Sequence, residues 1–277
     1  MHIVCAAASV IKNISTVDHV RGVTSVDDEL FVLLDERDDN QVRVYSINDY
    51  QQRRHLNVSR YEPDDPSDMT SCVRHKCLYM SDHDNRCIHR YELASSATAT
   101  SKWSVPGKPC GLSVTPSGNL LVTCLEPNKL VELSVDSGEC LREIALQSDI
   151  ECPLYSVQLT TGQFVICHGG AYSDLHRVCV VGDDGKVTRS YGGQRGSDVG
   201  QLNAPLHLAV DKDSQFIFVA DPGNHRVVLL SPTLEFVRYI EGLSWPQRLY
   251  YHQATRRLFV GRSGLLGLVG DVRVIQL

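Results

Sequence analysis

Cysteine and histidine, which zinc prefers as ligands, are concentrated in one short stretch of the chain. It contains Cys72, His75, Cys77, His83, Cys87 and His89. A structural zinc site needs four such side chains converging on one point. We expect Cys72 and Cys77 on either side of a tight hairpin, and Cys87 and His89 on one face of a later strand. The stretch has no Cys-x-x-Cys pair, so it predicts core cysteines and exposed histidines, with no metal and no cofactor.

Other residues that could do chemistry are acidic. The segment 62–68 contains Glu62, Asp64, Asp65 and Asp68, and a second acidic run covers 35–39. The chain of 277 residues has 33 acidic against 27 basic residues and a net charge of −6, which argues against a generally basic nucleic-acid binder. It has no Gly-x-Ser-x-Gly sequence, the turn that exposes a nucleophilic serine in many hydrolases.

The elements that must position these residues repeat along the chain. Each unit has a short apolar run, a loop with polar residues, and a β-branched residue in a following run. These β-branched anchors, spaced 43 to 49 residues apart, are Val42, Ile88, Val131, Val178, Val227 and Val274. A strand-rich repeat of this length is typical of a β-propeller. The sequence therefore predicts an all-β, six-bladed β-propeller.

The clearest copy of the unit is 203–230, which contains Asp221-Pro-Gly-Asn-His-Arg-Val. This copy resembles the NHL repeat, and the segment 206–211 resembles that family's first strand. The resemblance covers the whole chain as a period. It implies a propeller of the kind found at the C-terminus of tripartite-motif ubiquitin ligases, where it selects the substrate. The chain has no RING or B-box zinc pattern, so ligase activity is not expected within it.

The last unit reaches Leu277 after only three strands, whereas β-prone residues near Ser9-Val-Ile precede the first unit. We expect this N-terminal segment to complete the last blade, because closure removes an open sheet edge. The predicted organisation is a single domain over 1–277. Its blades are expected at 18–60, 61–104, 105–147, 148–198, 199–241 and 242–277 with 1–17.

Some six-bladed propellers are enzymes. The peptidyl-hydroxyglycine lyase uses Pro-His pairs at the starts of its first strands to bind zinc. We take the corresponding positions here, none of which is histidine, to be Arg21, Thr70, Cys110, Tyr155, Leu206 and Gln247. Calcium-dependent lactonases need an acidic cluster in the same mouth, which these positions do not offer. The sequence thus predicts a non-catalytic protein-interaction scaffold, with a metal-dependent lyase or lactonase as an alternative.

Recognition is expected at the rim formed by the loops that lead into first strands and those that join second to third strands. These loops carry more acidic than basic residues, so a basic protein or peptide fits better than single-stranded RNA, which remains an alternative. Asp64 and Asp65 should steer the partner. The expected contact residues at the rim and channel mouth are Arg21, Tyr155, His207, His225, Arg226, Gln247 and Arg248.

The ten cysteines lie mostly in predicted strands, which is typical of buried free thiols and favours a cytoplasmic location. No apolar run approaches the length of a membrane span.

Overall fold

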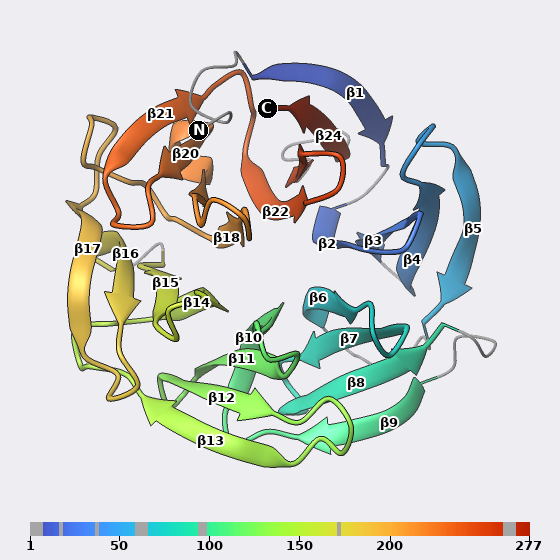
Figure 1. Cartoon of the computed structure of the whole chain (residues 1–277), viewed down its shortest axis with the longest axis horizontal. Helices are drawn as coiled ribbons and strands as arrows, with labels where there is room; N and C mark the ends of the chain where they lie inside the picture. The colour runs from blue at the N-terminus through green and yellow to red at the C-terminus, as the bar shows by residue number, and fades with distance from the viewer. Residues whose placement is uncertain are drawn as a thin grey trace.

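The computed structural model describes residues 8–16, 19–36, 39–58, 66–93, 99–170, 173–262 and 270–277. These residues form 24 strands in six four-stranded antiparallel sheets, arranged as blades around a central channel (Figure 1). They also form one short 3₁₀ helix, Pro222–Asn224. The prediction of an all-β, six-bladed propeller is confirmed.

The strands run outward from the channel in chain order within blades 1 to 5. Blade 1 has β2 (His19–Val26), β3 (Glu29–Glu36), β4 (Asp39–Ser46) and β5 (Gln52–Asn57). Blade 2 has β6 (Pro66–Cys72), β7 (Cys77–Asp82), β8 (Cys87–Glu92) and β9 (Ala99–Ser104). Blade 3 has β10 (Lys108–Val114), β11 (Leu120–Leu125), β12 (Lys129–Leu133) and β13 (Cys140–Ala145). Blade 4 has β14 (Pro153–Gln158), β15 (Phe164–His168), β16 (Leu175–Val181) and β17 (Val187–Gln194). Blade 5 has β18 (His207–Val210), β19 (Ile217–Asp221), β20 (Arg226–Leu230) and β21 (Phe236–Ile240).

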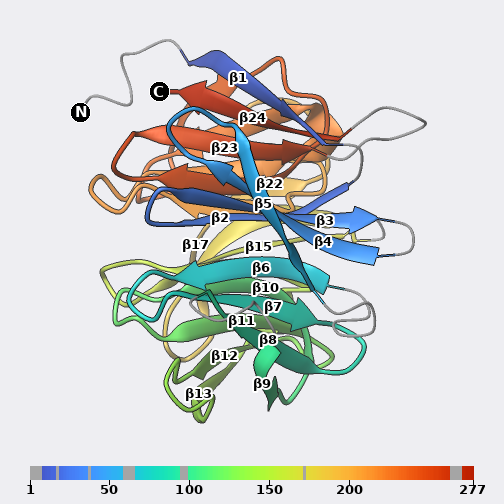
Figure 2. The same ribbon diagram turned by 90° about the vertical axis from the view of Figure 1, so that its right-hand side faces the viewer.

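Blade 6 is built from both ends of the chain. It consists of β22 (Pro246–His252), β23 (Arg257–Arg262), β24 (Asp271–Gln276) and, as its outer strand, β1 (Ser9–Ser15). β1 pairs antiparallel with β24, from Ser9 opposite Gln276 to Ser15 opposite Asp271. The two strands lie side by side in both views (Figures 1 and 2). The predicted closure of the ring by an N-terminal strand is confirmed.

The core consists of apolar layers between neighbouring blades. Each of the six buried clusters joins the facing sheets of two adjacent blades, and Ile14 of β1 contributes to the layer between blades 6 and 1. Second strands such as β7 and β19 are buried along their whole length, because both of their faces meet a neighbour. Outer strands such as β13 are largely exposed. No helix long and apolar enough to cross a membrane occurs in the part of the chain described.

Inner strands of adjacent blades approach closely at the channel. A Cβ atom on Gly111 of β10 would lie 2.6 Å from the Leu154 carbonyl oxygen and 2.9 Å from the Tyr155 Cα atom. Gly111 is therefore required by the distance between blades 3 and 4.

We expect Gly111→Ala to lower the free energy of unfolding by about 1–3 kcal/mol, because the methyl group overpacks a rigid contact. Gly170→Ala is the matched control, since a Cβ atom there meets its nearest neighbour at 3.9 Å. Urea unfolding measures both. Equal stabilities of the two variants would contradict the close approach.

Polar side chains are buried where the second strand of a blade ends and the third begins. In blade 4, Arg177 donates a hydrogen bond from Nε to Nε2 of His168 at 2.8 Å. Burial, with help from the Arg177 charge, lowers the pKa of His168 from 6.5 to about 4. The imidazole is thus neutral in the folded protein between these two pH values, whereas it takes up a proton when the chain unfolds.

Because the unfolded state binds the extra proton, stability falls as the pH drops from 6.5 towards 4. His168 should account for about 2 kcal/mol of the loss between pH 7.5 and pH 5. His168→Gln, whose amide oxygen can still accept from Arg177, should flatten the profile by that amount in urea unfolding. The exposed His55→Gln serves as the control, and an unchanged slope in His168→Gln would contradict the assignment.

Candidate functional site in the channel

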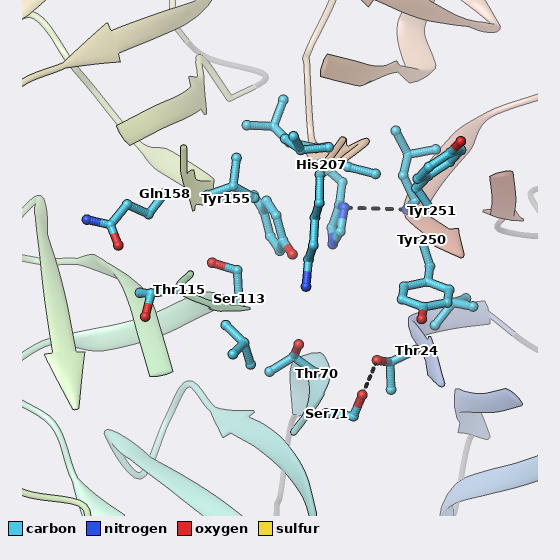
Figure 3. Close-up of a pocket in the computed structure, with 18 of the residues that line it drawn as sticks. Thr24, Thr70, Ser71, Ser113, Thr115, Tyr155, Gln158, His207, Tyr250 and Tyr251 are labelled. Carbon is cyan, nitrogen blue, oxygen red and sulfur yellow. Dashed lines mark hydrogen bonds between the residues drawn. The ribbon is translucent and has the colours of Figure 1, made fainter. Parts of the chain in front are cut away.

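Two cavities occupy the central channel. One of about 400 Å³ is lined by the later parts of the inner strands, and one of about 200 Å³ by their first residues. Tyr155 and His207 line both cavities, and their rings stack with centroids 3.7 Å apart. This pair therefore lies at the boundary between the two cavities, and Figure 3 shows it among the residues that line the larger one.

The larger cavity is lined by hydroxyl groups and aromatic rings. Figure 3 labels the polar lining residues Thr24, Thr70, Ser71, Ser113, Thr115, Gln158, Tyr250 and Tyr251. Thr24 and Ser71 share a hydrogen bond at 2.6 Å between Oγ1 and Oγ, which joins blades 1 and 2. Among the described residues its lining includes no carboxylate, and its basic side chains are His207 at the boundary with the smaller cavity and Lys212, so it offers mainly binding surface.

The smaller cavity holds the charged groups. Its lining includes Arg21, Asp68, His83, Cys110, His207 and Arg248. Burial raises the pKa of the Cys110 thiol, which keeps it protonated. Cys110 is thus a poor nucleophile, and the chemistry of the cavity depends on the other groups.

Asp68 is the buried carboxylate of the channel. It lies on β6, is only 2 % exposed, and accepts a hydrogen bond at Oδ2 from the Leu112 backbone N–H at 2.8 Å. Its Oδ1 atom lies 3.7 Å from His207 Nε2 and 3.8 Å from Arg248 Nε. The Oδ1 atom has no hydrogen-bond partner among the described residues. A buried polar atom left unpaired is costly and is often a functional feature.

His207 faces that oxygen. The Leu249 backbone N–H points to its Nδ1 atom at 3.4 Å, so the ring proton belongs on Nε2, the atom nearest Asp68. Burial lowers the pKa of His207 below its ordinary value, and the effect of Asp68 opposes this shift. The imidazole is therefore neutral near pH 7 and presents an N–H donor to the cavity.

Arg248 connects three blades across the channel. It donates from Nε to the Arg21 carbonyl at 2.6 Å, from Nη2 to the Ser67 carbonyl at 2.8 Å, and from Nη1 to the Gln247 carbonyl at 3.2 Å. Its guanidinium is thus held in place beside Asp68 by backbone groups of blades 1, 2 and 6.

Four of the predicted contact residues meet in the smaller cavity: Arg21, Tyr155, His207 and Arg248. Arg21 is also held by Asp35, with Nη2 2.6 Å from Oδ2. Gln247 occupies a bulge at the start of β22, beside this group.

The other predicted contact residues lie elsewhere. His225 is exposed, has a left-handed φ of 55°, and packs edge-on against Trp245 at 5.2 Å. Arg226 is buried, pairs with Asp221 at 2.8 Å and lies 3.9 Å above the Tyr239 ring, so it holds blade 5 together. Asp64 and Asp65 fall outside the described residues, so their role in steering a basic partner stays a prediction.

The sequence does not single out Asp68 as a site residue, because it is the last residue of the acidic segment 62–68, which is expected in a loop. A regular signal does identify it. Five inner strands begin near a proline, and the residue two positions after each proline is, in order, Asp68, Gly111, Tyr155, His207 and Arg248. The same alignment corrects two positions compared with the zinc lyase. The bulges show that Ser67 and Leu154, rather than Thr70 and Tyr155, occupy the positions equivalent to Arg21 and Cys110 in their own blades.

A catalytic metal does not fit this donor set. Among the described residues, the smaller cavity offers one carboxylate, two imidazoles and the Cys110 thiol, which burial keeps protonated, and the Arg248 guanidinium already lies next to the carboxylate. Within the described ranges, the one group of three or more His, Cys, Asp or Glu side chains with metal-ligand spacing is Asp82, Cys87 and His89, in blade 2.

Comparisons with known proteins inform the fold. No family model matches the chain, and no curated protein matches it in sequence. Among solved structures, a streptogramin B lyase shares 11 % identity over 98 % of this chain and 87 % of its own, with a TM-score of 0.66. The virginiamycin B lyase of Staphylococcus aureus shares 10 % identity over 98 % of this chain and 100 % of its own, with a TM-score of 0.62. A hydrazine synthase chain of Kuenenia stuttgartiensis shares 13 % identity over 93 % and 96 %, with a TM-score of 0.65.

These similarities establish the six-bladed propeller architecture and do not single out tripartite-motif proteins. They also correct one prediction. The chain was expected not to be an enzyme, yet two of the propellers that it resembles are lyases. The expectation relied on the scarcity of catalytic motifs in the sequence, and such motifs are not needed when the reacting groups come from different blades.

We expect Arg248→Met to lower the free energy of unfolding by about 3 kcal/mol or more, because three carbonyls lose a donor and Asp68 loses its neighbouring charge. Arg53→Met, on the exposed face of β5, is the control and should change stability by less than about 0.5 kcal/mol. Adding Asp68→Asn to Arg248→Met should restore part of the loss in urea unfolding. A double variant no more stable than the single one would contradict the electrostatic link.

Proposed function

We propose that the chain is an enzyme that breaks a bond in a small molecule by elimination, with Asp68 as the base. The observation that carries the proposal is the Oδ1 atom of Asp68, a buried carboxylate oxygen on a residue that lines the smaller cavity, with no hydrogen-bond partner among the described residues. The similarity of the fold to two lyases supports the same reaction class.

Elimination needs a base that can reach a proton on carbon. The Leu112 N–H fixes Asp68 through Oδ2, which leaves Oδ1 available to a molecule in the cavity. A general base must have such an unblocked atom within hydrogen-bond reach of its substrate. The nearby Arg248 guanidinium is a positioning group, because it donates to three backbone carbonyls.

His207 supplies a hydrogen-bond donor for the negative charge that develops in the reaction. When a proton leaves the carbon next to a carbonyl, negative charge develops on the carbonyl oxygen. The neutral imidazole of His207 presents its Nε2–H next to Asp68, where it can donate to that oxygen. A preorganised donor at a developing charge is one of the strongest contributions to catalysis.

The atoms balance without a metal or a cofactor. Asp68 takes the proton, the C–H electron pair forms the new double bond, and the bond to the leaving oxygen breaks with its electron pair. The leaving oxygen then takes up the proton from Asp68, which restores the carboxylate. Carbonyl compounds that carry an ester or lactone oxygen at the β-carbon meet these requirements.

The larger cavity supports binding of the unreactive part of such a molecule. It adjoins the Tyr155–His207 pair and carries hydroxyl groups and aromatic rings without a carboxylate. Small-molecule sites commonly combine apolar walls with a few polar groups in this way. A polar, uncharged substrate fits the lining.

The test is turnover of virginiamycin B and of a panel of β-acyloxy carbonyl compounds and lactones, followed by liquid chromatography and mass spectrometry. Hydrolysis adds the mass of one water, whereas elimination does not. We expect elimination by the wild-type protein, undiminished by a chelator, and a loss of about 100-fold or more in Asp68→Asn.

The exposed Asp136→Asn is the matched control and should keep full activity. Circular dichroism verifies that Asp68→Asn folds, which its shape favours because the amide oxygen can still accept from Leu112. Hydrolysis products alone, turnover retained in Asp68→Asn, or no turnover of any compound would refute the proposal.

A further inference from the structure

A second site lies outside the channel, in blade 2. It is at the level where the second strand of each blade ends and the third begins. The cross-strand pairs at this level are Leu34–Gln41, Asp82–Cys87, Cys124–Lys129, His168–Arg177, Asp221–Arg226 and Arg262–Asp271. These pairs occupy equivalent positions in the six blades, so differences between them are informative.

Four blades place a basic side chain at this level. These side chains are Lys129, Arg177, Arg226 and Arg262, whereas the blade 1 pair, Leu34–Gln41, carries no charge. In blades 5 and 6 the basic side chain neutralises the acidic member directly. The architecture thus accommodates a positive charge at this level.

Blade 2 differs from these four, because its pair has an acidic member and no basic one. Among the described residues, no Lys or Arg pairs with Asp82, whose partners are Asn85 and His89. Cys87 stands at the position that Arg226 occupies in blade 5, and His89 follows two residues later on the same face of β8. All three side chains are buried, with at most 1 % of their surface exposed.

The three side chains converge on one point. Nε2 of His89 lies 2.9 Å from Asp82 Oδ2 and 3.4 Å from Cys87 Sγ, and all the ligand atoms lie within 4.8 Å of one another. Tetrahedral zinc with ordinary bond lengths would separate a nitrogen from an oxygen ligand by about 3.3 Å and from a sulfur ligand by about 3.6 Å. The two distances from His89 are therefore within about 0.4 Å of those expected around a bound ion.

We propose that Asp82, Cys87 and His89 supply three ligands to a divalent transition-metal ion, zinc above all, with water as the fourth, in the place where four other blades hold a basic side chain. Thiolate, imidazole and carboxylate together favour zinc over calcium or magnesium, which prefer oxygen ligands alone. The Asn85 backbone N–H, 3.0 Å from Asp82 Oδ1, orients the carboxylate. Binding releases the Cys87 proton, and the ion then links β7 to β8.

Blade 4 supplies a natural contrast. His168 and Cys179 occupy the positions of Asp82 and His89, and their Nε2 and Sγ atoms lie 3.5 Å apart. There Arg177 takes the place of Cys87, and its Nε lies 2.8 Å from His168 Nε2. The guanidinium already fills this position, so blade 4 should not bind the ion.

The test is metal analysis of the full chain, purified without a polyhistidine tag from cells grown with zinc. We expect about one zinc ion per chain by inductively coupled plasma mass spectrometry. Cys87→Ser should lose it, and the matched control Cys179→Ser, another buried cysteine of a third strand, should keep it.

A second measurement needs no variant. Cobalt(II) added to chelator-treated wild-type protein should give a thiolate-to-metal charge-transfer band and the visible absorption of a tetrahedral ion, and zinc should abolish both. Wild-type protein without bound zinc and without the cobalt bands, or Cys87→Ser that binds as much metal as the wild type, would overturn the proposal. A stable hydrogen-bonded Asp82–His89 pair would then be the correct description.

Discussion

The apolar layer between neighbouring blades is the interaction on which the rest of this molecule depends. A blade has two broad apolar faces and cannot bury both by itself. Each face is covered only when a neighbour lies against it, and the six clusters show that this happens at every junction. At the junction between blades 6 and 1, Ile14 of β1 joins residues of β2, β3, β23 and β24 in the buried layer. Closure is thus a requirement of burial.

The same constraint shapes the centre of the ring. Inner strands meet there at distances that leave room for glycine at Gly22 and Gly111 and for a few large polar groups between them. Arg248 satisfies this confined space by donating to three carbonyls, and Leu112 and Leu249 bring their N–H groups to Asp68 and His207. Asp68, His207 and Arg248 are therefore held by the backbones of neighbouring blades, which gives them fixed positions without a dedicated loop.

Much of the fold could be predicted from the sequence, because the anchors from Val42 to Val274 mark equivalent strands and the incomplete last unit requires a strand from elsewhere. Tyr155, His207 and Arg248 could be placed near the channel mouth by the same spacing. Asp68 could not, because the acidic run before it conceals the start of β6. The meeting of Asp82 with Cys87 and His89 was also missed. It depends on the register between β7 and β8, which residue counting leaves undetermined.

The closed ring has a consequence for how the molecule comes apart. In an open array of repeats, a terminal unit is held by a single neighbour and can peel away first. Here each blade has two neighbours, so the release of any one of them breaks two layers at once. The two ends of the chain meet inside blade 6, where β1 pairs with β24, rather than at a boundary between blades. Separation of β1 from β24 alone leaves every blade with at least three of its strands in place, so the earliest opening is local and reversible. Global unfolding, in contrast, must break two apolar layers together, which is the kind of step that sets a kinetic barrier.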